Sequence, residues 1–288
     1  MNAVRALIDL ADATNRRVDD FIALLDKAAD RSTSAPARAD PMTVIFFDTW
    51  PAYEVFARRK GFAVNQSSPG FFDEASDCSY LYNFANAEAI RTRRDALLRA
   101  RAELIPAAAN ASPSDEKARA AREERLRRIR ELESQIDATM DVINATVTRH
   151  EIAHQVLFHR GIQRLDDPGR RWLKEGLAMQ FETTDAPNRH RLTDFRAIDP
   201  AKIKLPLVTL VTDPVVIGPG CEHPQEAYAM AWALAYYLSR EEPRAFAEYL
   251  RQSPVEGAAG RRWAFESAFG RIDDNFEQRF QRFMRQVN

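Results

Sequence analysis

The sequence predicts a helix-dominated α+β fold, with a small mixed sheet packed on one helix, a long helical hairpin and a C-terminal helical bundle. Only 10 of the 288 residues are glycine, which favours helices over turn-rich all-β architecture. Apolar residues mostly recur at helical spacing, and short runs of β-branched and aromatic residues mark few strands. No apolar run approaches the roughly 20 residues that cross a bilayer, so a membrane-spanning protein is excluded.

The charge balance disfavours polyanion binding as the main activity. Lysine and arginine total 41 against 42 acidic residues, so we expect no nucleic-acid partner. Cys78 and Cys221 are too few for a disulfide framework or a cysteine-based zinc site. Asp9 and Asp12 interrupt the apolar stretch that a secretory signal needs. We therefore expect a cytoplasmic protein, with export to the periplasm or medium as the alternative if Met1 is not the true start.

The spacing of apolar residues and the local composition predict the first helix, linker and strands. Residues 3–29 have helical spacing, and 31–41 form a linker by composition. The run 43–47 predicts a buried strand that leads into a capped helix, because Asp48, Thr49 and Pro51 follow it. Two further short strands are expected at 71–72 and 79–82, as a hairpin or a sheet edge.

A helical hairpin comes next, with helices over 86–105 and 114–160. Residues 86–138 contain twelve basic and ten acidic residues, which predicts a solvated helix face; an RNA-binding arm is the alternative. Gly161 followed by Ile162 predicts the end of the second helix.

The remaining chain is mostly helical. Helices are expected at 170–184, 225–240, 242–251 and from Asn275, with a proline-rich irregular segment at 200–224. We predict three segments: an N-terminal helix and linker (1–40), a catalytic domain with the hairpin 86–149 inserted (41–250), and a C-terminal helical segment (251–288).

Residues 150–154 read His-Glu-Ile-Ala-His. On a helix His150 and His154 are neighbours that can bind one cation, and Glu151 lies where it can take a proton from a metal-bound water. A catalytic zinc needs a third protein ligand, and Glu175 and Glu182, seven apart on one predicted helix face, are the candidates. Asp166 and Asp185 are weaker candidates. His159 and His190 are expected at the surface.

HEIAHQ and WLKEGLAMQFE, with twenty residues between His154 and Glu175, resemble the motifs of gluzincin zinc peptidases. The resemblance is greatest to the peptidase-MA-like bacterial proteins, and it extends over residues 43–250. It implies a zincin-type metal helix and one Zn²⁺ per chain on His150, His154 and Glu175. It also implies that Glu182 supports the ligands through a hydrogen bond.

The resemblance extends to Tyr228, which would donate to the oxyanion formed when water attacks a carbonyl. The stripe of Tyr228, Trp232, Ala235 and Tyr236 is equally typical of a core face, and His223 is a second candidate donor. In gluzincins an extended substrate pairs with a sheet edge, a role implied here for residues 70–82.

The sequence therefore predicts a zinc metallopeptidase that acts on a peptide or protein, with Glu151 as general base. Two alternatives remain open: a non-catalytic scaffold protein, and a zinc hydrolase of a non-peptide amide such as a cell-wall linkage. No feature of the sequence fixes the oligomeric state.

Overall fold

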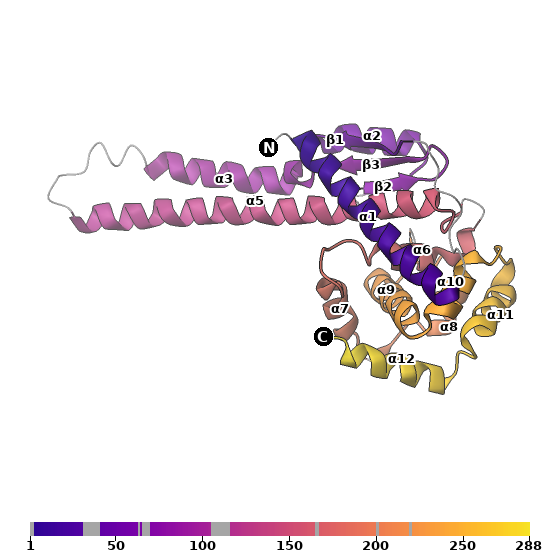
Figure 1. Cartoon of the computed structure of the whole chain (residues 1–288). Coiled ribbons are helices and arrows are strands. Elements are labelled where there is room, and N and C mark those ends of the chain that lie inside the picture. The colour runs from indigo at the N-terminus through magenta and orange to yellow at the C-terminus, as the bar shows by residue number, and fades with distance from the viewer. Residues whose placement is uncertain are drawn as a thin grey trace. The chain divides into compact units, whose positions relative to one another are not determined.

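The computed structural model describes residues 3–30, 41–62, 64, 70–104, 116–164, 167–199, 202–218 and 221–288. It is 71% helical with one three-stranded sheet, which confirms the predicted helix-dominated α+β class (Figure 1). The strands are β1 (Thr43–Phe47), β2 (Gly70–Asp73) and β3 (Cys78–Tyr82), in the order β1-β3-β2. No helix in the described part of the chain has the length and apolarity to span a bilayer.

The chain forms two compact units. One comprises residues 1–44, 71–80 and 148–288, and the other comprises 45–70 and 81–147. Residues 1–44 and 251–288 thus belong to the same unit as the His-Glu-Ile-Ala-His segment. The helix α5 (Glu116–His159) runs through both units.

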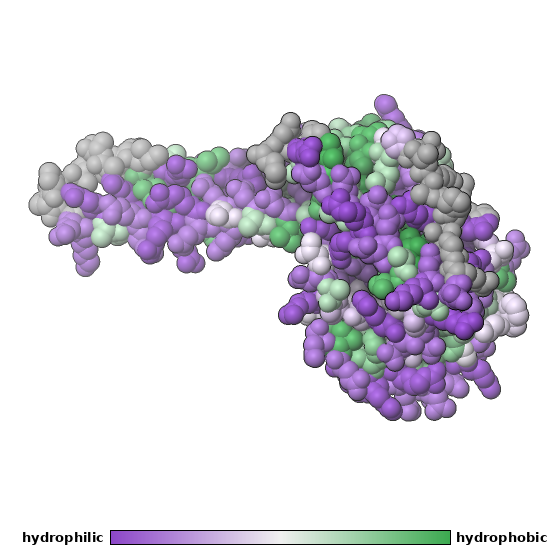
Figure 2. Space-filling model, viewed as in Figure 1, coloured by the Kyte–Doolittle hydropathy of each residue, from purple (hydrophilic) through white to green (hydrophobic). Residues whose placement is uncertain are grey.

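The second unit contains the predicted helical hairpin. Its helices are α2 (Trp50–Arg59), α3 (Glu88–Leu104) and the greater part of α5. Ion pairs join α3 to α5, with 2.6 Å between Arg94 Nη2 and Asp137 Oδ1. The hairpin face in view is mostly hydrophilic (Figure 2), as a solvated face requires. The predicted break between the two helices lies outside the described residues, as does the linker 31–40.

The first unit holds the main apolar core. Its helices are α1 (Ala3–Ala29), the end of α5, α6 (Arg171–Ala178), α7 (Arg189–Arg196), α8 (Leu207–Thr212), α9 (Pro224–Glu241), α10 (Pro243–Arg251), α11 (Gly257–Phe269) and α12 (Asp274–Gln286). Trp172 of α6 and Trp232 of α9 are fully buried. Aromatic rings of α10, α11 and α12 extend this core, among them Phe246, Phe265 and Phe276.

Gly161 ends α5 as predicted. Its φ of 70° is in the left-handed region, and Ile162 donates its amide to Leu157 O at 2.9 Å and buries its side chain. This stop fixes the length of the helix beyond the two histidines.

Three predictions of local structure were wrong. β1 is not buried: among the described strands it lies at an edge and pairs with β3 alone, and Ile45 and Phe46 are exposed. The helix expected over 170–184 ends at Ala178, and the carbonyls of Phe181 and Glu182 beyond it accept hydrogen bonds from Arg17 and Arg149. The segment expected to be irregular contains α8, because burial of its apolar residues outweighs the β propensity of valine and threonine.

The contact between α6 and α9 depends on Gly176. A Cβ at this position would lie 2.4 Å from the carbonyl oxygen of Ala231 and 2.9 Å from Ala235 Cβ. The glycine therefore lets the two helix backbones approach closely. Since Glu175 precedes it, this contact also sets the position of that carboxylate.

We expect Gly176→Ala to lower the free energy of unfolding by about 1–3 kcal/mol, because the new methyl group must displace the backbone of α9 and no flexible side chain can move aside for it. Urea denaturation measures the change. Gly260→Ala is the matched control. Gly260 is also helical, but its new methyl group would meet the side chain of Val255, with Cγ1 at 2.7 Å, and a side chain can move more easily than backbone. Equal costs for the two variants would contradict the role given to the α6–α9 contact.

Candidate metal centre

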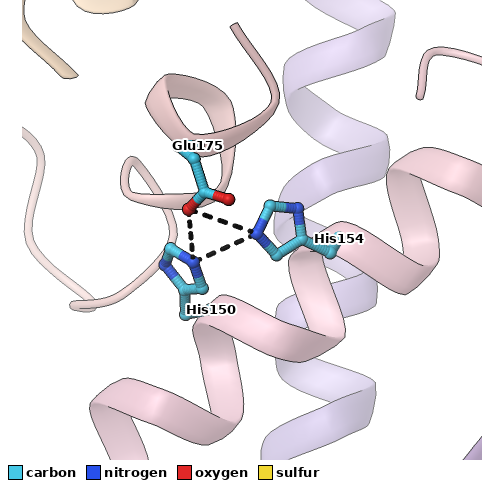
Figure 3. Close-up of side chains that lie close together, drawn as sticks. All are labelled: His150, His154 and Glu175. Carbon is cyan, nitrogen blue, oxygen red and sulfur yellow. Dashed lines mark hydrogen bonds and ion pairs between the residues drawn. The ribbon is translucent and has the colours of Figure 1, made fainter. Parts of the chain in front are cut away.

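Three predicted metal ligands converge in the first unit. One ligand atom each of His150, His154 and Glu175 lies within 4.8 Å of the other two. The two Nε2 atoms are 3.1 Å apart, and Glu175 Oε2 is 3.2 Å from His150 Nε2 and 3.7 Å from His154 Nε2. Figure 3 shows both imidazoles and the carboxylate pointing toward one point.

The outer hydrogen bonds of the histidines involve their Nδ1 atoms, so both Nε2 atoms face the centre of the cluster. His150 Nδ1 lies 3.1 Å from Glu182 Oε1, and His154 Nδ1 lies 3.0 Å from Gln163 Oε1. Both oxygens are acceptors, so in the neutral form of each imidazole Nδ1 carries the proton and Nε2 has the lone pair. A cation bound at the centre would replace the second proton, which the pairing with Glu175 otherwise holds on His150 Nε2.

The spacing of the three ligand atoms fits zinc. Zinc bonds of about 2.0–2.2 Å at tetrahedral angles put neighbouring ligand atoms about 3.3–3.5 Å apart. The three observed separations of 3.1, 3.2 and 3.7 Å bracket that value. Two imidazole nitrogens and one carboxylate oxygen are also a donor set that zinc accepts.

The ionisation of the cluster favours a positive charge at its centre. Burial opposes the charged form of His150, but hydrogen bonds with Glu175 and Glu182 raise the pKa of this imidazole well above its usual value. Burial likewise opposes ionisation of Glu175, but His154 and His150 hold the pKa of its carboxyl well below the usual range. The carboxylate is therefore ionised and available as a ligand at neutral pH.

Glu182 lies beyond α6, so it does not share a helix face with Glu175 as predicted. Its side chain is only 4% exposed, and it accepts hydrogen bonds from Asn188 at 3.0 Å and from Arg191 at 2.8 and 2.7 Å. Although burial opposes ionisation, His150 and Arg191 lower the pKa of Glu182 to about 2. A fixed carboxylate thus orients the His150 ring, which is the supporting position that the resemblance implied.

Glu151 is next to the cluster but outside the ligand set. It is buried, and its carboxylate accepts a hydrogen bond from the backbone amide of Phe72 in β2. Burial raises the pKa of Glu151 against the opposing effect of the two histidines. A carboxyl group with a raised pKa beside a cation site is suited to exchange protons with a substrate or water.

Tyr228 lies in the second turn of α9 and is half-buried. The charge of Glu175, together with burial, raises the pKa of the Tyr228 hydroxyl, which therefore remains protonated. The hydroxyl makes no hydrogen bond within the described part of the chain. Trp232 and Ala235, further along the predicted stripe, are fully buried in the core.

His159 is not a surface residue as predicted. It is 5% exposed, and its Nε2 lies 2.8 Å from both carboxylate oxygens of Asp77. Gln155 donates to Asp77 O at 2.9 Å and accepts from Ser79 Oγ at 3.1 Å. These bonds tie the β2–β3 turn to α5 beside the cluster. His190 is exposed as expected, and Cys78 and Cys221 form no disulfide.

Three residues around the cluster were not predicted, namely Gln163, Asn188 and Arg191. Gln163 follows the Gly161 stop by two residues and also donates to Lys174 O at 3.3 Å, which joins the end of α5 to α6. Asn188 caps α7, so its position after Pro187 was a usable signal for that helix. Their contacts with the cluster have no counterpart in local sequence pattern.

Comparison with known proteins gives a match that covers part of the chain. Residues 143–256 match a family described as a protein of unknown function (DUF1570). No curated protein and no solved structure matches the chain. The matched range contains all three candidate ligands together with Glu151, Glu182 and Tyr228.

We expect about one zinc per chain, because three suitable donors converge and their outer hydrogen bonds hold them in place. Glu175→Ala should abolish most of this binding, whereas Glu182→Ala should weaken it by about 10–100-fold. Elemental analysis and chelator competition measure both. Glu241→Ala, an exposed carboxylate in the last turn of α9, is the control and should bind normally. A greater loss from Glu182→Ala than from Glu175→Ala would reassign the third ligand.

Proposed function

We propose that the chain is a zinc-dependent peptidase. The observation that carries this proposal is the convergence of three zinc-type donors beside a buried carboxylate that is not one of them. The motif resemblance to gluzincins supports the same assignment.

Zinc bound by this cluster would polarise the scissile carbonyl and lower the pKa of water toward ~7. Glu151 accepts the proton of the attacking water, and its burial and raised pKa suit it to pass that proton to the leaving amine. Glu182 and Gln163 keep the two imidazoles in the required tautomer.

Tyr228 supplies a hydrogen bond to the oxyanion. Its hydroxyl is electrostatically coupled to Glu175 and Glu151, and it is not committed to another described group. A neutral phenol that retains its proton is a suitable donor to a developing negative charge.

A peptide substrate is favoured by the sheet. Among the described strands β2 has a neighbour on one side only, and the backbone of its Phe72 reaches Glu151. An extended peptide that pairs with such an edge would bring its backbone next to the proposed base. A scaffold protein would have no use for Glu151 at this position.

Glu151→Gln should keep its zinc and lose about 10²–10⁴-fold in kcat, because the amide cannot accept the proton. Cleavage of a quenched fluorescent peptide library, with elemental analysis of the same samples, measures both quantities. Glu248→Gln, on the outer part of α10, serves as control. Loss of zinc as complete as in His150→Ala would show that Glu151 is a ligand.

Tyr228→Phe should lower kcat by roughly 10²–10³-fold without changing zinc content or thermal stability, because only the hydroxyl is removed. Tyr236→Phe is the control, since Tyr236 is on the same helix and stacks on Trp232 with ring centroids 5.5 Å apart. If Tyr228→Phe turns over at the wild-type rate, Tyr228 is only a packing residue, and His223 is the next donor to test.

A further inference from the structure

Arg171 shares a helix face with the ligand Glu175. It is the first residue of α6 and precedes Glu175 by four positions. Side chains at this spacing are neighbours, with Cβ atoms about 5–6 Å apart. Arg171 is also exposed, so its side chain is accessible from solvent.

The segment 217–218 holds the guanidinium group in place. Arg171 Nη1 donates to Ile217 O at 3.0 Å. A Cβ on Gly218 would lie 2.5 Å from the same Nη1, so the absence of a side chain at Gly218 makes room for the guanidinium. Gly218 has a φ of 126°, which disfavours any other residue there.

The charge of Arg171 has no partner among the described residues. It makes no ion pair with them, although its neighbour Arg170 pairs with Asp167 and Arg191 pairs with Glu182. The first turn of a helix is also an unfavourable place for a cation. Neither helix stability nor a fold-stabilising ion pair therefore accounts for the charge.

We propose that Arg171 is a specificity-determining residue that binds a carboxylate group of the substrate. This inference rests on the function proposed above. The described residues accept one hydrogen bond from this guanidinium, and its remaining N–H groups can form a paired, charge-assisted hydrogen bond with a carboxylate. The carboxylate would belong either to an acidic side chain near the scissile bond or to the C-terminus of the substrate.

The electrostatics of Tyr228 support this position. Glu175 and Glu151 raise the pKa of its hydroxyl, whereas Arg171 lowers it. Arg171 is therefore close enough to act on the hydroxyl proposed to contact the oxyanion. A substrate carboxylate held by Arg171 would be bound beside the reacting bond.

Three peptidyl hydroxamates test the proposal with the zinc-loaded protein. One carries glutamate with an amidated C-terminus, one carries glutamine with an amidated C-terminus, and one carries glutamine with a free C-terminal carboxylate. Calorimetry measures their affinities for the wild type, for Arg171→Gln, and for the control Arg244→Gln on α10. Thermal unfolding verifies that each variant is folded.

We expect at least one carboxylate probe to bind the wild type and Arg244→Gln about 10–100-fold more tightly than the neutral probe, as charge-assisted hydrogen bonds allow. Arg171→Gln should bind all three alike. The tighter probe identifies whether a side chain or the C-terminus supplies the carboxylate.

Gly218→Ala should reduce the same preference while retaining Arg171, because the new methyl group displaces the guanidinium. Equal binding of all three probes by the wild type, or a preference that persists in Arg171→Gln, would overturn the inference and leave the proposed function standing. If no hydroxamate binds, the proposed zinc peptidase fails, and the inference fails with it.

Discussion

The close approach of α6 to α9 is the constraint on which the site depends. Glu175 must meet two histidines from a different helix, and α6 has only eight residues to place it. Gly176 allows the backbone of α6 to rest directly on Ala231, so the carboxylate is positioned by main chain rather than by flexible side chains. The same contact relates Glu175 to Tyr228, because Tyr228 lies near the N-terminus of α9, the helix that α6 packs against.

Around this contact, hydrogen bonds decide which atoms face the centre. Glu182 and Gln163 accept hydrogen bonds from the Nδ1–H groups of the two histidines, so both Nε2 atoms point inward. Arg191 and Asn188 in turn hold Glu182, and the carbonyl of Glu182 accepts from Arg149. Each group is fixed by a partner further from the centre, which lowers the entropy cost of binding a cation.

Local chemistry made part of this arrangement predictable. The histidine pair and the Gly161 stop depend only on helix geometry, and the sequence pattern was sufficient for both. The position of Glu182 was not predictable in the same way, because α6 ends before it and its partners come from other helices: Arg149 of α5 donates to its carbonyl and Arg191 of α7 to its carboxylate. His159 was misplaced for the same reason: its burial depends on Asp77, in the turn of a distant hairpin. Even α5 changes from a mostly exposed to a mostly buried helix near Thr148, a change that depends on tertiary packing.

The two arginines that act on Tyr228 differ in whether a carboxylate of the fold neutralises their charge. The positive charges of Arg191 and Arg171 both lower the pKa of the Tyr228 hydroxyl. Arg191 is largely buried against the carboxylate of Glu182, so its charge is neutralised within the fold and serves to hold the carboxylate that orients His150. Arg171 is exposed, is held by a backbone carbonyl and has no carboxylate among the described residues. With zinc bound by the cluster, the charge of Arg171 would add to that of the metal, so the surroundings of the reacting bond would attract an anionic group. An acidic substrate would then supply the charge that the fold supplies to Arg191.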